Sequence, residues 1–359
     1  MCDSNGSLSR PNGRVVPLEE AVGMLLEHDI TEIRQGEFKG RAFKRGHRVC
    51  KTDLDRLRDL GKNNLYVLSL ADDEMHEDDA AFSLAEALRG AGVVLEGEPH
   101  EGKINLVAER GGLLRIDRDA LFAFNMLGDV ICSTLHDNTV VRRGQILAGT
   151  RAIPLAVKKD IVGKAVEIAH EARMRGVGVV SIAEIRKPNA GIVITGNEVY
   201  YGRKQDAFSS VIEDKVRGFD GVVAGKYYAP DDEGYIEDRL RELIDAGADL
   251  LIVTGGMSVD PDDVTRFAIR KLGAENVVYG SPALPGSMVL IGYLEKEKTI
   301  PIIGVPACGM FHKTTVFDLL LPRILTGERI GRRELAEMGH GGLCMNCKEC
   351  GYPHCPFGK

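Results

Sequence analysis

Apolar and polar residues follow two different patterns along this chain, and the change falls near residue 186. Before it, short apolar runs are separated by Gly and Asp turns, which predicts a mixed α and β region that is rich in strands over 15–185, as one or two subdomains. Within this region, helical spacing predicts helices at 16–28, 52–61 and 80–89, and an apolar run predicts a strand at 65–70.

From residue 186 on, buried apolar runs alternate with amphipathic stretches. We expect strands at 190–196, 222–229 and 248–256, helices at 208–218, 231–247, 262–273 and 313–325, and further strands within 275–307. This alternation predicts an α/β fold with a doubly wound, mostly parallel sheet and helices on both faces. Ligands of such sheets bind beyond the carboxyl ends of the strands, so functional residues are expected just after Ile194, Val253 and Val305.

Composition narrows the class of protein. The 359 residues suggest two or three domains, and 44% hydrophobic with 28% charged residues is ordinary for a soluble globular protein. A net charge of −7 without a long basic run argues against nucleic acid as a partner. No apolar stretch reaches the ~20 residues that span a bilayer, and the polar residues 1–14 predict a loose leader without a secretory signal. We therefore expect a cytoplasmic protein without a membrane partner.

The sharpest motif is TGGMSVDPDDVT at 254–265, where a buried strand enters a Gly-Gly turn and a helix is expected to follow. Paired glycines allow a ligand to approach the backbone closely, and a helix start favours a phosphate or another oxyanion. Three aspartates, at 260, 262 and 263, would repel a bare phosphate, so a Mg²⁺ ion between the carboxylates and the phosphate is expected. The alternative is that Asp262 only caps the helix and the glycines only turn the chain.

Four other segments are predicted at the same sheet edge. They are TGNEVYYGRKQD at 195–206, YAPDDEGYI at 228–236, and the Pro/Gly turns within 281–288 and 303–310. Each alone is ordinary turn chemistry, but together they could form a composite site for a polar ligand.

The motifs TGNEV, PDD, TGGMSV with D-V-T, LPG and GVPACG occur in this order over residues 186–325. In this respect the segment resembles the molybdopterin-binding domain shared by molybdopterin molybdotransferase, molybdopterin adenylyltransferase, gephyrin and the competence-damage-inducible protein family. The resemblance implies that the dithiolene and phosphate of molybdopterin lie along the strand edge. It also implies that molybdate or tungstate is the second substrate.

The resemblance further implies roles for individual residues. Asp263 and Asp231 match acidic residues of the family, with catalytic roles and with Asp263 as the Mg²⁺ ligand. Arg203, Lys204 and Lys215 would hold molybdate or the pterin phosphate. Asn197 departs from the family, because the adenylyltransferase branch has Asp there. The implied cofactor-binding residues are Thr195, Gly196, Glu198, Arg203, Asp206, Thr254, Gly255, Gly256, Ser258, Pro285 and Gly286.

Three functions remain open at this point. The first is a transferase that inserts molybdate or tungstate into molybdopterin with Mg²⁺. The second is a non-catalytic carrier or insertion chaperone that delivers the cofactor to a molybdenum or tungsten enzyme. The third is a nucleotide pyrophosphatase of the competence-damage-inducible type. A homo-oligomer is implied by the resemblance alone.

The last segment, 331–359, carries half of the eight cysteines: Cys344, Cys347, Cys350 and Cys355. Their spacing, C-x2-C-x2-C-x4-C-P, is one residue longer than the ferredoxin run and predicts one metal centre. An iron–sulfur cluster and zinc both remain open, as does a mobile thiol tail that transiently hands over metal or sulfur. The other four cysteines show no ligand spacing, and Cys308 is expected to be a core thiol.

Overall fold

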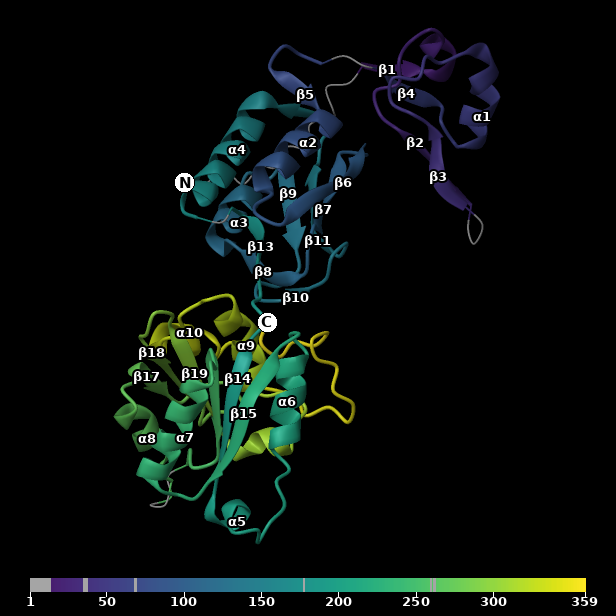
Figure 1. Cartoon of the computed structure of the whole chain (residues 1–359). Helices are drawn as coiled ribbons and strands as arrows, with labels where there is room; N and C mark the ends of the chain where they lie inside the picture. The colour runs from purple at the N-terminus through teal and green to yellow at the C-terminus, as the bar shows by residue number, and fades with distance from the viewer. Residues whose placement is uncertain (1–13, 35–37, 68–69, 177, 259, 261–262) are drawn as a thin grey trace. The chain divides into compact units, whose positions relative to one another are not determined.

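The computed structural model describes residues 14–34, 38–67, 70–176, 178–258, 260 and 263–359 (Figure 1). The chain divides into two compact units: unit 1 holds Met1–Asp137 and Val141–Ala183, and unit 2 holds Asn138–Val140 and Glu184–Lys359. The leader expected at 1–14 falls, apart from Arg14, outside the described residues. Among the described residues, no helix combines the length and the apolar character that crossing a bilayer requires.

The first part of unit 1 is built from two small antiparallel pairs. Its elements are β1 (Arg14–Pro17), η1 (Leu18–Ala21), β2 (Ile30–Arg34), β3 (Phe38–Phe43), η2 (Lys51–Asp53), α1 (Leu54–Asp59) and β4 (Asn64–Val67). Strand β1 pairs with β4, and β2 pairs with β3. The helix predicted at 16–28 is wrong: Gly23 has φ +91°, and Leu26 bridges to Val67 of β4. Pairing with residues far along the chain determines the secondary structure of this segment, and the spacing of apolar residues does not predict such pairing.

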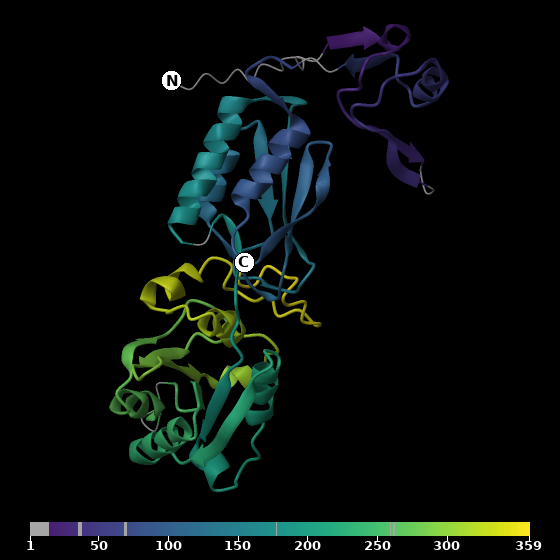
Figure 2. The same cartoon turned by 45° about the horizontal axis from the view of Figure 1, so that its top comes forward.

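The rest of unit 1 packs two helices against a strand-rich core. Its elements are β5 (Glu74–His76), α2 (Glu77–Leu88), β6 (Val93–His100), β7 (Lys103–Ala108), β8 (Gly112–Ile116), α3 (Arg118–Asn125), β9 (Val130–Thr134), β10 (Val140–Val141), β11 (Ile146–Ala152), β12 (Ala156–Lys158), α4 (Lys159–Met174) and β13 (Val180–Ala183). Helices α2 and α4 lie side by side on one face of the antiparallel sheet β6-β7-β11-β9 (Figures 1 and 2). The expected strand-rich character of this region is confirmed, although α3 was not predicted.

Unit 2 alternates strands and helices along most of its length. Its elements are β14 (Asn189–Thr195), α5 (Asn197–Tyr200), α6 (Ser209–Arg217), β15 (Val222–Ala229), α7 (Glu233–Asp245), β16 (Leu250–Thr254), α8 (Thr265–Lys271), β17 (Glu275–Tyr279), β18 (Leu290–Leu294), β19 (Ile300–Val305), η3 (Ala307–Met310), α9 (Val316–Leu325) and α10 (Arg332–Glu337). These bounds follow the predicted elements closely, with a helix, α10, in the segment predicted only as a tail.

One six-stranded sheet organises unit 2, in the order β15-β14-β16-β19-β18-β17. The first four strands are parallel, whereas β18 and β17 run antiparallel to their neighbours. One face packs on α6 and α9 and the other on α7 and α8, so strands such as β16 are buried on both faces. This explains their unbroken apolar sequences. The predicted doubly wound, mostly parallel sheet is confirmed.

Two helices of unit 2 begin later than predicted. Helix α8 begins at Thr265, so Asp263 precedes the helix, and Asp262, the expected cap, lies outside the described residues. Helix α9 begins at Val316, because Thr315 caps it: the Thr315 Oγ1 accepts from the Phe317 N–H at 3.2 Å, and the Asp318 carboxylate accepts from the Thr315 N–H at 2.7 Å. This reciprocal capping fixes the start of the helix.

Candidate functional site

A buried threonine connects the carboxyl ends of β14 and β16. The Thr195 hydroxyl donates to the Thr254 carbonyl at 2.9 Å and lies 3.1 Å from the Thr265 hydroxyl. The three residues are 5%, 1% and 0% exposed. Buried hydroxyls of this kind are costly unless they are paired, so this network holds two strand ends and the start of α8 in one arrangement.

The Gly-Gly turn that follows β16 requires glycine at both positions. Gly255 has φ +85° and Gly256 has φ +60°, which side chains rarely adopt. A Cβ at Gly255 would lie 2.5 Å from the Thr195 carbonyl oxygen, and a Cβ at Gly256 would lie 2.2 Å from the Thr265 Oγ1. Both glycines are half-buried. The turn therefore presents backbone without side chains at the sheet edge, as the sequence predicted.

Met257, the residue that follows the turn, packs its side chain against the neighbouring strand β19. Met257 is 3% exposed and packs on Gly304 of β19, where an added Cβ would lie 2.4 Å from its Cε. The Met257 carbonyl accepts a hydrogen bond from the Tyr279 hydroxyl at 2.5 Å. Ser258 is exposed, while Asp263 is half-buried and donates its N–H to the Asp260 carbonyl at 3.0 Å.

A reciprocal pair joins the loops that follow β14 and β15. The Asn197 N–H donates to the Asp231 carboxylate at 3.0 Å, and the Asp231 N–H donates to the Asn197 side-chain oxygen at 3.3 Å. Asn197 thus has a defined structural partner although the adenylyltransferase branch has Asp there. Asp231 is placed beside the first residue of α5, with Gly196 just before it at φ +136°.

Asp206 accepts hydrogen bonds from the residues that lead into α6, whose N-cap is Phe208. Its Oδ1 accepts from the N–H groups of Phe208 (2.7 Å) and Ser209 (3.0 Å), and its Oδ2 accepts from the Tyr228 hydroxyl at 2.9 Å. Burial alone would raise the pKa of Asp206, but these hydrogen bonds outweigh it and hold the pKa below its usual range. The carboxylate is thus engaged in fixing α6 and β15 at the site.

The cationic residues of this edge fall into two groups. Arg203 and Lys204 are exposed, as is Glu198, and the Arg203 guanidinium lies 5.9 Å from the centre of the Tyr201 ring. Lys215, by contrast, forms an ion pair with Asp318 and donates to the Lys313 carbonyl at 2.9 Å. Lys215 therefore links α6 to the start of α9, whereas the exposed pair can still meet a ligand.

The Pro-Gly turn at 285–286 closes on α9. The Pro285 carbonyl accepts from the Val316 N–H at 3.0 Å, and a Cβ at Gly286, with φ +113°, would lie 2.5 Å from the Val316 Cγ1. The structure thus gives this turn a packing contact with the helix.

The C-terminal segment, 331–359, packs against the rest of unit 2. The Cys344 N–H donates to the Leu284 carbonyl at 2.9 Å, Phe357 is 2% exposed, and the Tyr352 hydroxyl donates to the Asp318 carbonyl at 3.4 Å. The Thr314 Oγ1 lies 3.3 Å from the Cys350 Sγ. This segment lines a cavity of about 340 Å³ together with the β19–α9 loop, and the lining includes Phe311, His312, Lys313, Thr314, Cys344, Cys347, Lys348, Cys350, Tyr352, Cys355 and Phe357.

No three His, Cys, Asp or Glu side chains converge as a single bound ion would need, in the part of the chain that the structure describes. This holds for the tail cysteines and for the acidic residues of the strand edge alike. The spacing of these residues in the sequence does not tell whether their side chains converge in the fold.

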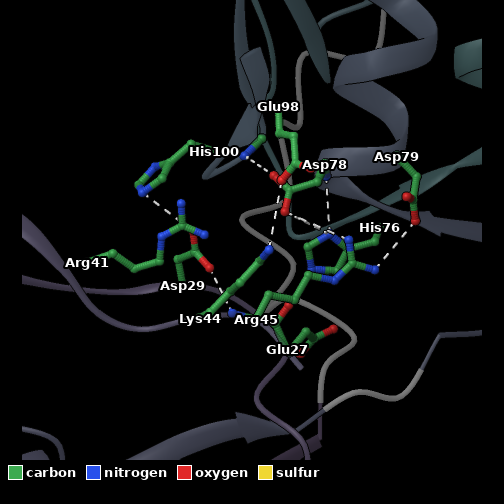
Figure 3. Close-up of polar contacts among 11 residues, drawn as sticks. Glu27, Asp29, Arg41, Lys44, Arg45, His76, Asp78, Asp79, Glu98 and His100 are labelled. Atoms are coloured by element: carbon green, nitrogen blue, oxygen red, sulfur yellow. Dashed lines mark hydrogen bonds and ion pairs between the residues drawn. The ribbon is translucent and has the colours of Figure 1, made fainter. Parts of the chain in front are cut away.

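Sequence reasoning missed a polar cluster in unit 1, which Figure 3 shows. Asp29, whose side chain is 3% exposed, pairs with Arg41 (3.2 Å) and His100 (3.4 Å) and accepts the Arg45 N–H at 2.7 Å. The Arg45 guanidinium reaches Asp78 at 3.7 Å. The basic run at 44–48 and the acidic run at 72–79 were the only sequence signals of this pairing.

The same cluster contains buried titratable groups. Burial and the nearby Glu74 carboxylate raise the pKa of Glu27, whose two side-chain oxygens have no hydrogen-bond partner among the described residues. His76 is fully buried with its ring against the Glu27 carbonyl, and burial lowers its pKa. Burial, and next the Asp78 charge, raise the pKa of Glu77 to about 7. Glu74 and Glu77, within the acidic run 72–79, are therefore part of the core.

Comparison with known proteins now adds family information. Residues 191–326 match a family described as a probable molybdopterin binding domain, and residues 15–69 match a domain of unknown function. A CinA-like protein of Mycobacterium avium is 40% identical over 88 residues, which are 23% of this chain and 20% of that protein. A protein of Pyrobaculum calidifontis is 38% identical over 92 residues, which are 25% of this chain and 35% of that protein. The matched segments thus span a fifth to about a third of these curated relatives.

Solved structures of similar fold include two molybdopterin or tungsten cofactor proteins. The tungsten cofactor synthesizing protein MoaB of Pyrococcus furiosus is 18% identical, with 40% of this chain and 99% of that chain covered and a TM-score of 0.34. The molybdopterin biosynthesis enzyme MoaB of Thermus thermophilus is 23% identical, with 39% and 98% covered and a TM-score of 0.33. The family match over residues 191–326, to a probable molybdopterin binding domain, agrees with the resemblance that the motifs indicated.

Proposed function

From a molybdopterin-binding domain at residues 191–326, we propose that this protein binds molybdopterin at the carboxyl ends of β14, β15 and β16 and inserts molybdate or tungstate in a Mg²⁺-dependent step. The observation that carries the proposal is the turn at Gly255 and Gly256. Both glycines have positive φ, and neither has room for a Cβ. Successive backbone N–H groups in such a turn form a concavity for an anion, which suits the pterin phosphate.

The Mg²⁺ site is proposed at Asp263. Mg²⁺ in proteins is typically held by one or two carboxylates, with the substrate phosphate and water completing its shell. Such a site needs no cage of protein ligands, and the half-buried Asp263 follows the glycine turn by a short loop. Asp231, held in place by Asn197, supplies a second carboxylate at the next strand end. When bound, Mg²⁺ supplies neutralisation of the phosphate charge.

The remaining residues at this edge are proposed to position the substrates. Arg203, exposed on the loop after β14, would hold the oxyanion. Thr195 and Thr254 would fix the strand ends beneath the ligand, and Ser258 would donate to it. Catalysis would then arise from positioning and charge neutralisation, without a covalent intermediate.

Two measurements test this proposal. Mass spectrometry of the molecule that co-purifies with the full chain should identify a pterin, whereas a nucleotide would contradict it. Calorimetry with the pterin and Mg²⁺ should show a loss of affinity of tenfold or more for Asp263→Ala, which is about 1.4 kcal/mol. The matched control is Asp245→Ala, which removes an exposed carboxylate at the far end of α7. Equal affinities in the two variants would refute the assignment of Asp263.

A carrier or insertion chaperone is the first alternative. The packed cysteine segment, which adds a second candidate site to the binding domain, favours it. Turnover of molybdate and molybdopterin distinguishes the two functions. Tight pterin binding without product would assign the carrier function, with a molybdenum or tungsten enzyme as its partner.

A nucleotide pyrophosphatase is the second alternative, and the 40% identity to a CinA-like protein over 88 residues favours it. The same turn and the same Asp263 would then hold a nucleotide diphosphate with Mg²⁺. Release of AMP from a dinucleotide would support this activity, and its absence in the presence of Mg²⁺ would remove it.

The proposal extends to the cysteine segment and to the assembly. Cys344, Cys347, Cys350 and Cys355 are proposed to hold one metal centre, either an iron–sulfur cluster or zinc. We further propose a cytoplasmic homo-oligomer, which light scattering of the purified chain would test directly.

A further inference from the structure

We propose that a group of tyrosines after β14 and β15 forms a subsite for the planar heteroaromatic ring of the ligand whose phosphate meets the glycine turn. This subsite rests on the proposed function, because it names where the ring of that same ligand would bind. Four of the nine tyrosines of the chain meet here, so aromatic side chains are concentrated at one place. The group, which we call the tyrosine cluster, consists of Tyr200, Tyr201, Tyr227 and Tyr235 with Arg203 and Arg239.

The side chains of the tyrosine cluster contact one another in a continuous series. The Arg239 guanidinium lies 5.2 Å from the ring centres of both Tyr227 and Tyr235. The centres of the Tyr235 and Tyr200 rings are 5.5 Å apart, and the Tyr200 hydroxyl donates to the Tyr235 hydroxyl at 3.3 Å. The Tyr200 and Tyr201 rings then meet edge to face at 5.1 Å. These are favourable aromatic and cation–π geometries, so the series orients its rings before any ligand arrives.

The outer end of this series is open to solvent. Tyr201 is 63% exposed and Tyr200 is 36% exposed, although both rings are held by a neighbour. Arg203 is also exposed, and its guanidinium lies 5.9 Å from the centre of the Tyr201 ring. A ring that is already oriented loses little conformational entropy when a second ring covers it. Stacking on aromatic side chains depends little on ring substituents, because every such ring has a π-face.

The tyrosine cluster lies at the same edge of the sheet as the glycine turn. A Cβ at Gly255 would lie 2.5 Å from the Thr195 carbonyl oxygen, and α5 begins two residues after Thr195. The reciprocal pair of Asn197 and Asp231 fixes the start of α5 at this edge, and Figure 1 shows α5 beyond the ends of β14 and β15. Only about 5 Å of helix separates Asn197 from Tyr200. A ligand with a ring and a phosphate a few bonds apart can therefore reach both places.

A small ligand fits this surface better than a protein partner does. The residues around Tyr201 include the exposed charges of Glu198 and Lys204. The cores of protein interfaces are depleted of Glu and Lys, although they are rich in Tyr and Arg. A phosphate-bearing ligand, by contrast, gains from a cation next to its ring, and Arg203 provides one. Pterins and adenine nucleotides share this chemistry, so the experiment has to distinguish them.

Calorimetry of the full chain with separate fragments of the ligand tests the subsite. The probes are pterin itself, which carries no phosphate, adenosine, and inorganic phosphate with Mg²⁺. We expect Tyr201→Ala to weaken pterin binding tenfold or more, which is about 1.4 kcal/mol, and to leave phosphate binding unchanged. Tyr201→Phe should retain pterin affinity, because the ring face remains. The matched control is Phe122→Ala, which removes a ring of unit 1 that is similarly exposed.

Each outcome decides a separate statement. Equal pterin affinity of the wild type and Tyr201→Ala overturns the ring subsite and leaves the proposed function, which the co-purified ligand decides. Adenosine that binds in place of pterin and depends on Tyr201 supports the subsite and contradicts molybdopterin as the ligand. A wild-type chain that binds neither ring overturns the subsite. A change of mass of Tyr201→Ala in light scattering, at unchanged pterin affinity, assigns the surface to protein contacts and also overturns it.

Discussion

The substitution Gly256→Ala should lower the stability of the protein in two ways, through its backbone conformation and through steric overlap. At φ +60° any side chain carries a backbone penalty of about 1–2 kcal/mol. In addition, the new Cβ would lie 2.2 Å from the Thr265 Oγ1 and 3.1 Å from its Cβ, so a buried residue must move. Overpacking of this kind costs about 1–3 kcal/mol. The expected total is about 2–5 kcal/mol in the free energy of unfolding.

The matched control is Gly273→Ala, which follows α8 in the same unit. Gly273 has φ +95°, but nothing lies within 4 Å of its added Cβ, so only the backbone penalty applies. Urea unfolding of the full chain, followed by far-UV circular dichroism, should place Gly256→Ala about 1–3 kcal/mol below the control. The chain has two units, which can unfold in separate transitions. The two variants are therefore compared in the transition that both of them shift. Equal destabilisation of the two variants would refute the steric reasoning.

Three further predictions concern other residues. The first concerns Glu77, whose pKa in the folded protein is about 7, above its usual 4.5. The stability that its neutral form contributes is therefore present below pH 4.5 and is lost as the pH rises through 7. The lost contribution to the free energy of unfolding is about 3 kcal/mol. Glu77→Gln should therefore flatten the pH dependence of unfolding between pH 5 and 8, and the exposed Glu98→Gln should leave it unchanged. Asp206→Ala should cost about 1–2 kcal/mol through loss of the hydrogen bonds that its carboxylate accepts from the start of α6 and from Tyr228, with Asp206→Asn losing less in the same melt. Thr195→Val should cost about 1–3 kcal/mol by leaving the Thr254 carbonyl without its donor, and full stability would contradict that network.

How far the sequence predicts this fold depends on how local the determining contacts are. Strand β15 occupies the predicted residues 222–229, because an apolar run between turn residues is a local signal. The segment 16–28 has the spacing of an α-helix, but pairing with residues far along the chain makes it the end of a strand, one short 3-10 turn and two isolated bridges. Residues 72–79 appear solvated by composition, yet Glu74 and Glu77 are buried by contacts that only the folded chain provides.

The candidate site shows the same division. Glycines and threonines at strand ends could be predicted, because motif order places them at one edge of the sheet. The partners of Asp206 and Lys215 could not be predicted, because the hydrogen bond from Tyr228 to Asp206 and the ion pair from Lys215 to Asp318 depend on how α6 packs against its neighbours. The cavity shared by the cysteines and the β19–α9 loop likewise joins residues up to 46 positions apart in the sequence, from Phe311 to Phe357.

The support under Met257 has a consequence for the thermodynamics of binding. Met257 is anchored by Gly304 beneath its side chain and by the Tyr279 hydroxyl at its carbonyl, while Thr195 holds the turn on its other side. The conformational entropy of residues 254–258 is therefore lost when the chain folds and does not have to be lost again when a ligand arrives. A ligand should meet a preorganised surface, and association should proceed without a slow conformational phase.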